Sequence, residues 1–358
     1  MRNDRIQKVI KHMHEKAIDQ LLVTSEASLF YLTEHWVHPM ERFLALLIRT
    51  NGDCIYVAND LFYVSEKVSC PILRYNDRQD AVAVLTEVLA DKGIIGVEAS
   101  LRAGFLLKLQ ESLHNAQIVE ASSCVQKVRM IKDAGEIQLL RESSAINDKA
   151  IGDLIARIHA GCKEAEISHM APEIYCGYGA EGYHSCPIVS FGKNAADPHH
   201  SADGTVLQQG DCIVIDTGSI YRDYCSDMTR TVFFQNISRE MENVYQTVLE
   251  AQRYASSIIR PGIPCCEIDR AARRIIEEAG YGSYFNHRVG HNLGLEGHEA
   301  PGISEDNPMP VREGMVFSVE PGVYLPGVGG VRIEDLVVVT KDGHESLSHY
   351  PKELKILH

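Results

Sequence analysis

The spacing of apolar residues predicts an α/β domain in the first third of the chain. Near the N-terminus, apolar residues recur at helical spacing, which predicts an amphipathic helix: Ile6, Val9, Ile10, Met13 and Ala17. Short apolar runs predict strands at 21–23, 44–48, 54–57 and 94–97. Helical patterns cover 78–92 and 102–114. This mixture predicts an α/β domain over residues 1–124, whose end falls within a polar boundary stretch at 121–135.

The remaining residues, 125–358, show helices followed by strands, and then the same order again. A long helix is predicted to begin near Glu136, and a second is predicted to begin at Ser238, a residue type that caps helix N-termini. A third helix is predicted over 267–279. Strands are predicted at 188–191, 212–217, 229–234, 315–320 and 331–340. The repeated order predicts an α+β domain made of two similar halves packed face to face.

Two aspartates occur beside the apolar strand runs of the first half. Asp216 follows the run Ile213–Ile215, and Asp227 precedes the run 229–234. A tight hairpin with its loop at 221–222 would set the two aspartates opposite each other. Facing like charges destabilise a sheet, and buried carboxylates raise each other's pKa unless a cation lies between them. A bound metal ion resolves this conflict, whereas a single aspartate would more simply lie on a solvated face.

Two glutamates and three histidines extend this chemistry downstream. Glu320 ends an apolar run before a Pro-Gly turn, and Glu334 lies inside another run. The segment HRVGHNLGLEGHE, which lies between the two aspartates and these two glutamates, contains His287, His291 and His298. A lone histidine is most often structural, so each is weak evidence alone. Four carboxylates with an imidazole and no thiolate suit Mn²⁺, Co²⁺, Fe²⁺ or Zn²⁺, and their charge would balance two such ions in a hydrolytic centre.

The sequence resembles the pita-bread metallopeptidases, which include methionine aminopeptidase, aminopeptidase P and prolidase (Xaa-Pro dipeptidase). The motifs VIDTG, SDMTRT, GHNLGLEGHE, SVEPGVY and GVRIED occur in the order and spacing of that family. The resemblance is strong over residues 125–358. An α/β N-terminal domain of the creatinase type fits the prolidase and aminopeptidase P branch. The resemblance therefore implies a pita-bread catalytic domain of the creatinase/aminopeptidase type.

The resemblance assigns roles to individual residues. It implies five ligands for two divalent metal ions, of which manganese is expected: Asp216, Asp227, His291, Glu320 and Glu334. Asp227 and Glu334 would bridge the two ions. It implies catalytic roles for His199, His298 and Glu320, with His200 as the less favoured neighbour of His199, and substrate-binding roles for His287, Arg332 and Tyr324. Arg332 also resembles the arginine that supports a metal ligand in the family. It lies two residues before Glu334, so strand alternation would place both on one face.

The implied reaction is hydrolysis of a peptide bond that precedes proline. Glu320 would carry a proton to the leaving nitrogen, and His298 or His199 would stabilise the developing oxyanion. A Xaa-Pro dipeptidase is the first expectation. Aminopeptidase P and a metal-dependent hydrolase of a small non-peptide amide on the same fold are the alternatives. A non-catalytic peptide-binding module is a distant fourth, because such modules tend to lose metal ligands and this chain keeps five.

The amino-acid composition limits the kinds of partner and the cellular location that we expect for this chain. The net charge of −14 disfavours nucleic-acid and anionic-membrane partners. The N-terminus lacks the apolar segment of a signal peptide, and the ten cysteines form no regular framework, so a reduced cytoplasmic protein is expected. Relatives in the family are often dimers, so a homodimer is expected, and residues 31–43 are either a pocket wall or a strand-to-loop connection with a packed Trp36. Asn292 stands where relatives commonly have glycine, which leaves its effect on substrate choice open.

Overall fold

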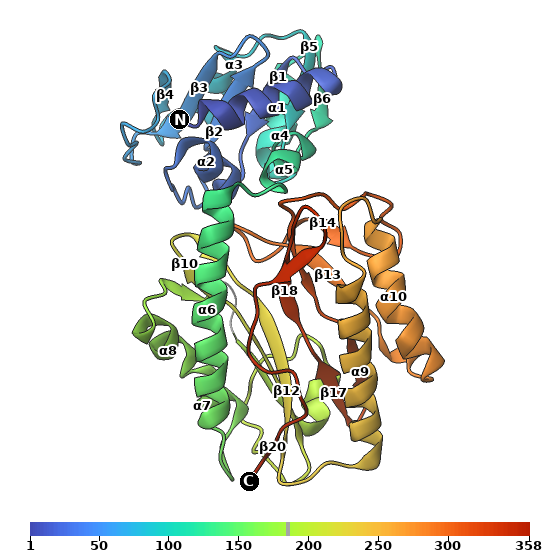
Figure 1. Cartoon of the computed structure of the whole chain (residues 1–358). Helices are drawn as coiled ribbons and strands as arrows, with labels where there is room; N and C mark the ends of the chain where they lie inside the picture. The colour runs from blue at the N-terminus through green and yellow to red at the C-terminus, as the bar shows by residue number, and fades with distance from the viewer. Residues whose placement is uncertain (184–186) are drawn as a thin grey trace. The chain divides into compact units, whose positions relative to one another are not determined.

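The computed structural model describes residues 1–183 and 187–358 and forms two compact units, Met1–Arg129 and Met130–His358 (Figure 1). The boundary predicted after residue 124 falls inside helix α5 (Ser123–Arg129). Each unit has its own apolar core, so each is described by itself.

The N-terminal unit is a six-stranded mixed sheet with helices packed against it. The strand order is β4-β3-β2-β1-β5-β6, with β1–β2 and β2–β3 antiparallel and the other neighbours parallel. The strands are β1 (Gln20–Val23), β2 (Ala45–Arg49), β3 (Cys54–Asn59), β4 (Ile72–Tyr75), β5 (Gly93–Val97) and β6 (Ala116–Glu120). The other helices are α1 (Asn3–Glu15), α2 (Glu26–Thr33), α3 (Ala81–Thr86) and α4 (Ala103–Ser112).

All four strands predicted for this unit are present, and one predicted helix is much shorter than expected. Instead of 78–92, helix α3 covers only Ala81–Thr86. The Asp80 side chain accepts a hydrogen bond from the backbone N–H of Val82 and begins the helix there. After Thr86 the backbone closes with bonds that span three residues, from Glu87 N to Val84 O, which tightens and ends the helix.

Residues 31–43 are the last turn of α2 followed by a loop, so the expected strand-to-loop connection is wrong in its first part. Trp36 stacks on Phe30 with ring centroids 4.5 Å apart, within its own unit. The tryptophan is therefore packed against the helix that precedes it.

The C-terminal unit contains the predicted order of helices and strands twice. The first set is α6 (Ala134–Ala156), α7 (Glu164–Ser168), α8 (Ala171–Gly177), β7 (Gly182–Tyr183), β8 (Ile188–Phe191), β9 (Cys212–Thr217), β10 (Ser219–Tyr221), β11 (Tyr224–Cys225) and β12 (Met228–Phe234). The second set is α9 (Arg239–Ser257), α10 (Cys265–Glu278), β13 (Gly290–Asn292), β14 (Glu299–Ile303), β15 (Val316–Val319), β16 (Gly322–Leu325), β17 (Gly329–Arg332), β18 (Asp335–Val339), β19 (His344–Ser346) and β20 (Ile356–Leu357).

The strands of this unit lie between two helical layers (Figure 1). One apolar core joins α6, α7 and α8 to β8, β9 and β12, and another joins α9 and α10 to β15, β17 and β18. The two larger sheets of this unit have the strand orders β20-β12-β9-β8 and β14-β13-β15-β18-β19, and most of the predicted site residues lie on or next to their strands. The polar groups of the site are therefore held by strands whose other side chains are anchored in apolar cores.

The helix starts follow their sequence signals. Asp133 and Glu136 form a reciprocal capping box, in which each side chain accepts from the other residue's backbone N–H, and this begins α6. The Ser238 side chain accepts from Met241 N and begins α9, as predicted.

The predicted strand 331–340 is wrong as a single element. Residues Gly329–Arg332 pair with β16, whereas Asp335–Val339 pair with β15 and β19 in a different sheet. The chain therefore leaves one sheet and enters another at Ile333–Glu334, so Glu334 lies between two strands.

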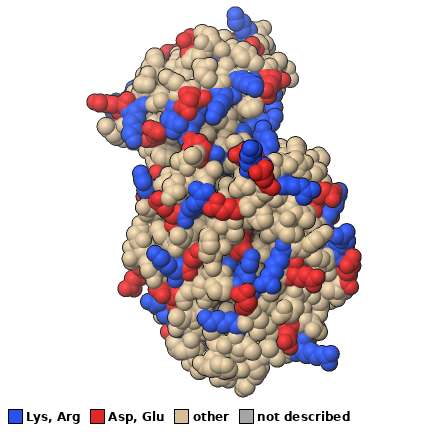
Figure 2. Space-filling view, viewed as in Figure 1, with Lys and Arg blue, Asp and Glu red and all other residues tan. Residues whose placement is uncertain are grey.

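Charged side chains of both signs are interspersed on the face shown in Figure 2. The net charge of −14 is therefore not gathered into one acidic patch on that face.

Gly290 allows β13 to approach β15 closely. A Cβ atom at this position would lie 1.9 Å from the carbonyl oxygen of Ser318. We expect Gly290→Ala to lower the free energy of unfolding by about 1–3 kcal/mol, as overpacking of a tight site does. Gly177→Ala is the control, because a Cβ there has no described heavy atom within 4 Å. Urea unfolding of both variants measures the difference, and equal midpoints would contradict the steric argument.

Candidate active site

The register of β9 and β12 brings the two aspartates together in a way that differs from the predicted hairpin. Asp216 is paired with Thr229 rather than with Asp227. A small hairpin, β10–β11, is inserted between the strands, and its turn residues Arg222 and Asp223 have positive φ values of 48° and 73°. Asp227 thus lies just before β12, and it still borders the same cavity as Asp216. The prediction that the two aspartates are paired across the strands is wrong, but both carboxylates line the same cavity.

His291 is held in β13 with one ring nitrogen free to face the carboxylates. Its Nδ1 lies 3.1 Å from the carbonyl oxygen of Asn292, and because a carbonyl only accepts, Nδ1 carries the proton of this bond. Its Nε2 lies 3.2 Å from Glu320 Oε1 and 3.8 Å from Asp227 Oδ2. A backbone partner on one ring nitrogen that orients the other is the usual arrangement of a metal-binding histidine.

The two glutamates approach from the ends of strands. Glu320 directly follows β15, and its Oε1 accepts a hydrogen bond of 3.0 Å from Ser318 Oγ. Glu334 Oε2 accepts a hydrogen bond of 2.7 Å from Thr229 Oγ1, and Thr229 is the residue paired with Asp216 in the sheet. The other oxygen, Glu334 Oε1, is buried and has no hydrogen-bond partner among the described residues. An unsatisfied buried carboxylate oxygen is costly, and a metal ion would satisfy it.

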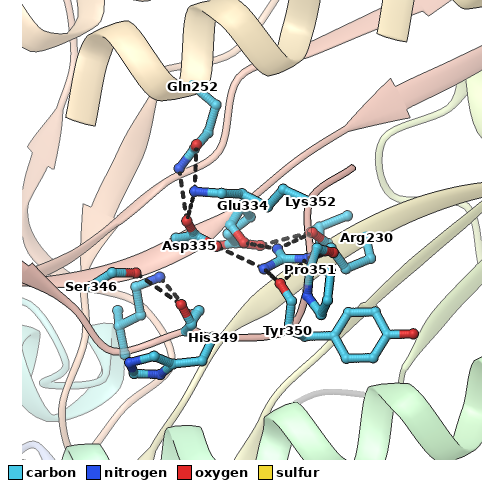
Figure 3. A network of polar contacts seen from close by, with 12 residues as sticks. Arg230, Gln252, Glu334, Asp335, Ser346, His349, Tyr350, Pro351 and Lys352 are labelled. Atoms are coloured by element: carbon cyan, nitrogen blue, oxygen red, sulfur yellow. Dashed lines mark hydrogen bonds and ion pairs between the residues drawn. The ribbon is translucent and has the colours of Figure 1, made fainter. Parts of the chain in front are cut away.

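A buried polar network holds the backbone of Glu334 in place (Figure 3). The Arg230 guanidinium donates to the carbonyl oxygens of Glu334 and Tyr350, and it forms an ion pair with Asp335 at 2.8 Å. Asp335 also accepts hydrogen bonds from Lys352 Nζ and from Gln252 Nε2 on α9. The C-terminal segment and α9 are thereby linked to the carbonyl oxygen of Glu334 and to the side chain of Asp335.

The pKa values of the carboxyl groups in the cluster are shifted in different directions: those of Asp216 and Glu334 are raised, and that of Glu320 is lowered. Burial raises the pKa of Asp216 to about 6, and the Arg332 guanidinium opposes the shift. Burial also raises the pKa of Glu334 well above its ordinary value, with the charge of Asp227 adding to it. Burial would raise the pKa of Glu320 too, but the hydrogen bond and charge of His291 outweigh it and lower that pKa to about 2. Burial would lower the pKa of His291, but the hydrogen bond and charge of Glu320 outweigh it and raise that pKa. Without added positive charge, this cluster cannot hold all its carboxylates ionised at low cost.

The remaining predicted residues also reach the cavity or its wall. The cavity has a volume of about 630 Å³. The predicted residues that line it are Asp216, Asp227, Glu320, Glu334, His199, His287, His291, His298 and Arg332. The His298 ring stacks on His291 with centroids 3.8 Å apart. His287 Nε2 lies 2.9 Å from Tyr324 Oη, which also accepts a bond from Arg332. Of the adjacent pair, His199 borders the cavity, whereas His200 is bonded at 2.8 Å to the buried Glu164.

The Arg332 guanidinium is hydrogen-bonded to other residues of the protein. Its Nη2 donates to Asp216 Oδ2 at 2.5 Å and its Nη1 to Tyr324 Oη at 2.9 Å. The expected strand alternation between Arg332 and Glu334 is wrong, because the strand ends at Arg332. Both side chains reach the cavity nonetheless, because the chain changes sheets between them.

Sequence reasoning missed several supporting residues. Thr229 bonds both Glu334 and Arg332, and Arg230 braces Glu334 from behind. The signal for Arg230 was a charged residue within the apolar run 229–234, since a buried arginine needs partners. Asn286 and Arg288, which flank His287, also line the cavity. Nothing in their local sequence pattern distinguished them from surface residues.

Three side chains offer ligand atoms within 4.8 Å of one another: Asp227, His291 and Glu334. A second such group combines Glu164, His200 and Asp203. Both carboxylate oxygens of Glu164 already accept hydrogen bonds, from Phe191 N and His200 among others. The first group, with its unsatisfied oxygen, is therefore the better fit to a metal ion.

Comparison with known proteins decides the family. Residues 138–341 match metallopeptidase family M24, and residues 5–131 match the creatinase/prolidase N-terminal domain. The chain belongs to metallopeptidase family M24. The predicted fold class and the resemblance to the pita-bread metallopeptidases are confirmed, and a divalent metal ion is part of the chemistry of such a family.

Relatives match along nearly the whole length. A Xaa-Pro dipeptidase from Pyrococcus horikoshii is 33% identical over 354 residues, which is 98% of this chain and 99% of the relative. The structure of a prolidase from Thermococcus sibiricus has a TM-score of 0.95 at 32% identity, covering 100% of this chain and 99% of that one. An X-Pro aminopeptidase from Thermotoga maritima has a TM-score of 0.84 at 32% identity, covering 98% and 99%. Within residues 1–183 and 187–358, no helix is long and apolar enough to cross a membrane.

The network behind Glu334 can be tested without touching the cavity. We expect Lys352→Met to lower the free energy of unfolding by about 1–2 kcal/mol, because it leaves the buried Asp335 with one charged donor fewer. Lys355→Met is the control, because the Lys355 side chain is exposed and its one hydrogen bond among the described residues is a 3.4 Å contact with Tyr350 Oη. Urea unfolding measures both variants, and equal losses would show that Asp335 does not depend on Lys352.

Proposed function

We propose that this metallopeptidase is a Xaa-Pro dipeptidase that works with two divalent metal ions. The observation that carries the proposal is the convergence of four carboxylates and an imidazole on one cavity that also contains an unsatisfied buried oxygen of Glu334. The residues that would hold the ions are Asp216, Asp227, His291, Glu320 and Glu334. The names of the dipeptidase and prolidase relatives support the choice of substrate.

The donor set fits the proposed ions. Four carboxylates would match the charge of two dications, and the oxygen-rich set with one imidazole suits Mn²⁺ first, with Co²⁺, Zn²⁺ or Fe²⁺ as alternatives. His291 Nε2, which lies 3.2 Å from Glu320 Oε1, is the ring nitrogen that would be offered to an ion. When bound, such ions supply an activated water and polarise the scissile carbonyl.

The protein's own side chains would direct the reaction. Glu320, whose pKa is lowered to about 2, is ionised at neutral pH and can accept a proton and pass it to the leaving nitrogen. His199 and His298 border the cavity and would donate to the oxyanion. His287 and Tyr324 are joined by a hydrogen bond and would orient the substrate. Arg332 would keep Asp216 and Tyr324 in position.

Proline after the scissile bond suits this chemistry, because an Xaa-Pro amide has no N–H that the site must satisfy and its ring has a fixed shape. Aminopeptidase P is the second candidate, favoured by the likeness to the X-Pro aminopeptidase structure. A non-peptide amide hydrolase on the same fold is a third. A homodimer and a cytoplasmic location stay predictions.

The function is tested by a product assay. Protein supplemented with Mn²⁺ should release proline from Ala-Pro with a kcat/KM at least about tenfold above that for Ala-Ala, a ratio within the range that one substrate pocket can provide. Preferential cleavage of Ala-Pro-Ala would instead indicate an aminopeptidase. Failure on all three peptides, with both ions bound, would overturn the peptidase proposal in favour of a non-peptide substrate.

The metal ligands are tested by Asp227→Asn. Removing one carboxylate charge from the proposed ligand set should lower the metal content well below the two ions per chain expected of the unaltered protein, as measured by elemental analysis. Because burial raises the pKa of Asp216 to about 6, this carboxyl must release a proton to bind an ion, so the affinity for Mn²⁺ should fall as the pH is lowered through about 6. Unchanged metal content in the variant would contradict the ligand assignment.

A further inference from the structure

A buried glutamate, Glu164, binds the chain segment that carries His199. Glu164 is the first residue of α7, and its side chain has no exposed surface. Its two carboxylate oxygens together accept hydrogen bonds from four N–H groups of this segment, at 2.6, 3.1, 2.8 and 3.2 Å: Phe191 N, Asn194 Nδ2, His200 Nε2 and Asp203 N. One carboxylate therefore joins residues at both ends of the segment 191–203.

This segment has little regular structure of its own to hold it in place. Between the end of β8 and the start of β9 at Cys212, it contains one short 3₁₀-helix, Gly192–Ala196, and no strand. The backbone of such a loop needs partners other than a strand ladder. The first N–H groups of α7 supply two of them, because Glu164 N donates to Thr205 O and Ala165 N donates to Asp203 O. The start of α7 is therefore a support for the loop, and the Glu164 side chain extends this support toward His199.

The imidazole of His199 depends on its neighbours, because its ring has no hydrogen bond or ion pair with any described residue. His199 borders the cavity. The residues on either side of it are bonded instead: the Pro198 carbonyl oxygen accepts from Arg332 Nη1 at 3.2 Å, and His200 is bonded to Glu164. The position of the His199 ring is therefore set through the backbone of the loop.

The two adjacent histidines have different partners. His200 does not line the cavity, and its Nε2 lies 2.8 Å from Glu164 Oε2. Because an ionised carboxylate only accepts, Nε2 carries the proton of this bond, which is a charge-assisted bond of the stronger kind. An active-site group must be held within about 0.5 Å by groups that are themselves fixed. A displacement of about 1 Å can lower a rate by about 10²-fold.

We propose that Glu164 is a positioning residue, which acts through His200 and the segment 191–203 to hold the imidazole of His199 where it donates to the developing oxyanion. This inference rests on the proposed peptidase function, in which His199 is an oxyanion donor. It adds a residue outside the cavity on which that donor depends. Because Glu164 does not line the cavity, its loss should lower turnover and spare the binding of substrate and metal ions.

The first test removes one bond to Glu164. His200→Leu has no donor for the carboxylate, whereas His200→Gln can still donate an amide N–H to it. With Ala-Pro as substrate and Mn²⁺ added, His200→Leu should lower kcat by about tenfold and leave KM within about twofold. This loss is smaller than the roughly 10²-fold expected when an oxyanion donor is removed altogether. His200→Gln should recover most of kcat, and elemental analysis should find unchanged metal content in both variants.

The carboxylate itself is tested by Glu164→Gln, with Glu98→Gln as the matched control. A glutamine amide presents a donor to groups that also donate, so Glu164→Gln should lower kcat at least as much as His200→Leu does. Glu98 is likewise buried and accepts from the backbone N–H groups of Thr24 and Ser25, but it belongs to the N-terminal unit. Glu98→Gln should lower the midpoint of urea unfolding without changing kcat.

A double-mutant cycle separates the positioning of His199 from general damage to the fold. In a His199→Ala background, His200→Leu should cause less than about twofold further loss of kcat, because effects that act through one group are not additive. NMR spectra of protein labelled with ¹⁵N-histidine, recorded without added metal, give a readout without turnover. The ring signal of His199, identified by its absence from His199→Ala, should shift in His200→Leu and in Glu164→Gln but not in Glu98→Gln.

The outcomes distinguish this inference from the proposed function. A further loss of about tenfold in the His199→Ala background, an unshifted ring signal, or equal losses in His200→Leu and His200→Gln would overturn the role of Glu164 and leave the peptidase function in place. Normal turnover of His199→Ala would do the same. Cleavage of neither Ala-Pro nor Ala-Pro-Ala by the unaltered enzyme would overturn the proposed function itself, and the inference about Glu164 with it.

Discussion

The burial of like charges around one cavity is the constraint on which the rest of the C-terminal unit depends. Asp216, Asp227, Glu320 and Glu334 border the same space, and burial raises the pKa of two of them. Side chains of the protein offset only part of this cost, through Arg332 on Asp216 and His291 on Glu320. The balance requires cations, which is why such an arrangement belongs to a metallopeptidase and would be costly in a protein without a metal ion.

The cluster is held by strand ends rather than by flexible loops. Asp216 lies in β9, Glu320 follows β15, and Glu334 stands where the chain passes from one sheet to another. Thr229 links two of these positions, because it is paired with Asp216 in the sheet and donates to Glu334. Anchoring in apolar cores on both sides gives the ligands a rigid frame, and a rigid frame lowers the cost of bringing charges together on binding an ion.

The C-terminal segment takes part in this frame. Carbonyl oxygens at Tyr350 and Pro351 accept hydrogen bonds from Arg230, which also braces the backbone of Glu334 (Figure 3). Asp335 connects Arg230, Lys352 and Gln252 in one buried group. Such a network is stable only when each member is satisfied, so residues far from the chemistry are coupled to the geometry of a ligand.

The sequence by itself determined the chemistry of the site and most of the elements that carry it. Carboxylates beside apolar runs marked Asp216, Asp227, Glu320 and Glu334, and helix caps at Asp133 and Ser238 follow local rules that a short segment obeys by itself. Only the tertiary structure decided which strands pair. The inserted β10–β11 hairpin changed the partner of Asp216, and the break at Ile333–Glu334 divided one apolar run between two sheets. Apolar periodicity reports burial but not the neighbour against which a strand is buried, since pairing depends on residues far away in the chain. For the same reason, the apolar run around Arg230 indicated that this arginine is buried but not which groups it binds: the fold places the carbonyl oxygen of Glu334 and the carboxylate of Asp335 beside it.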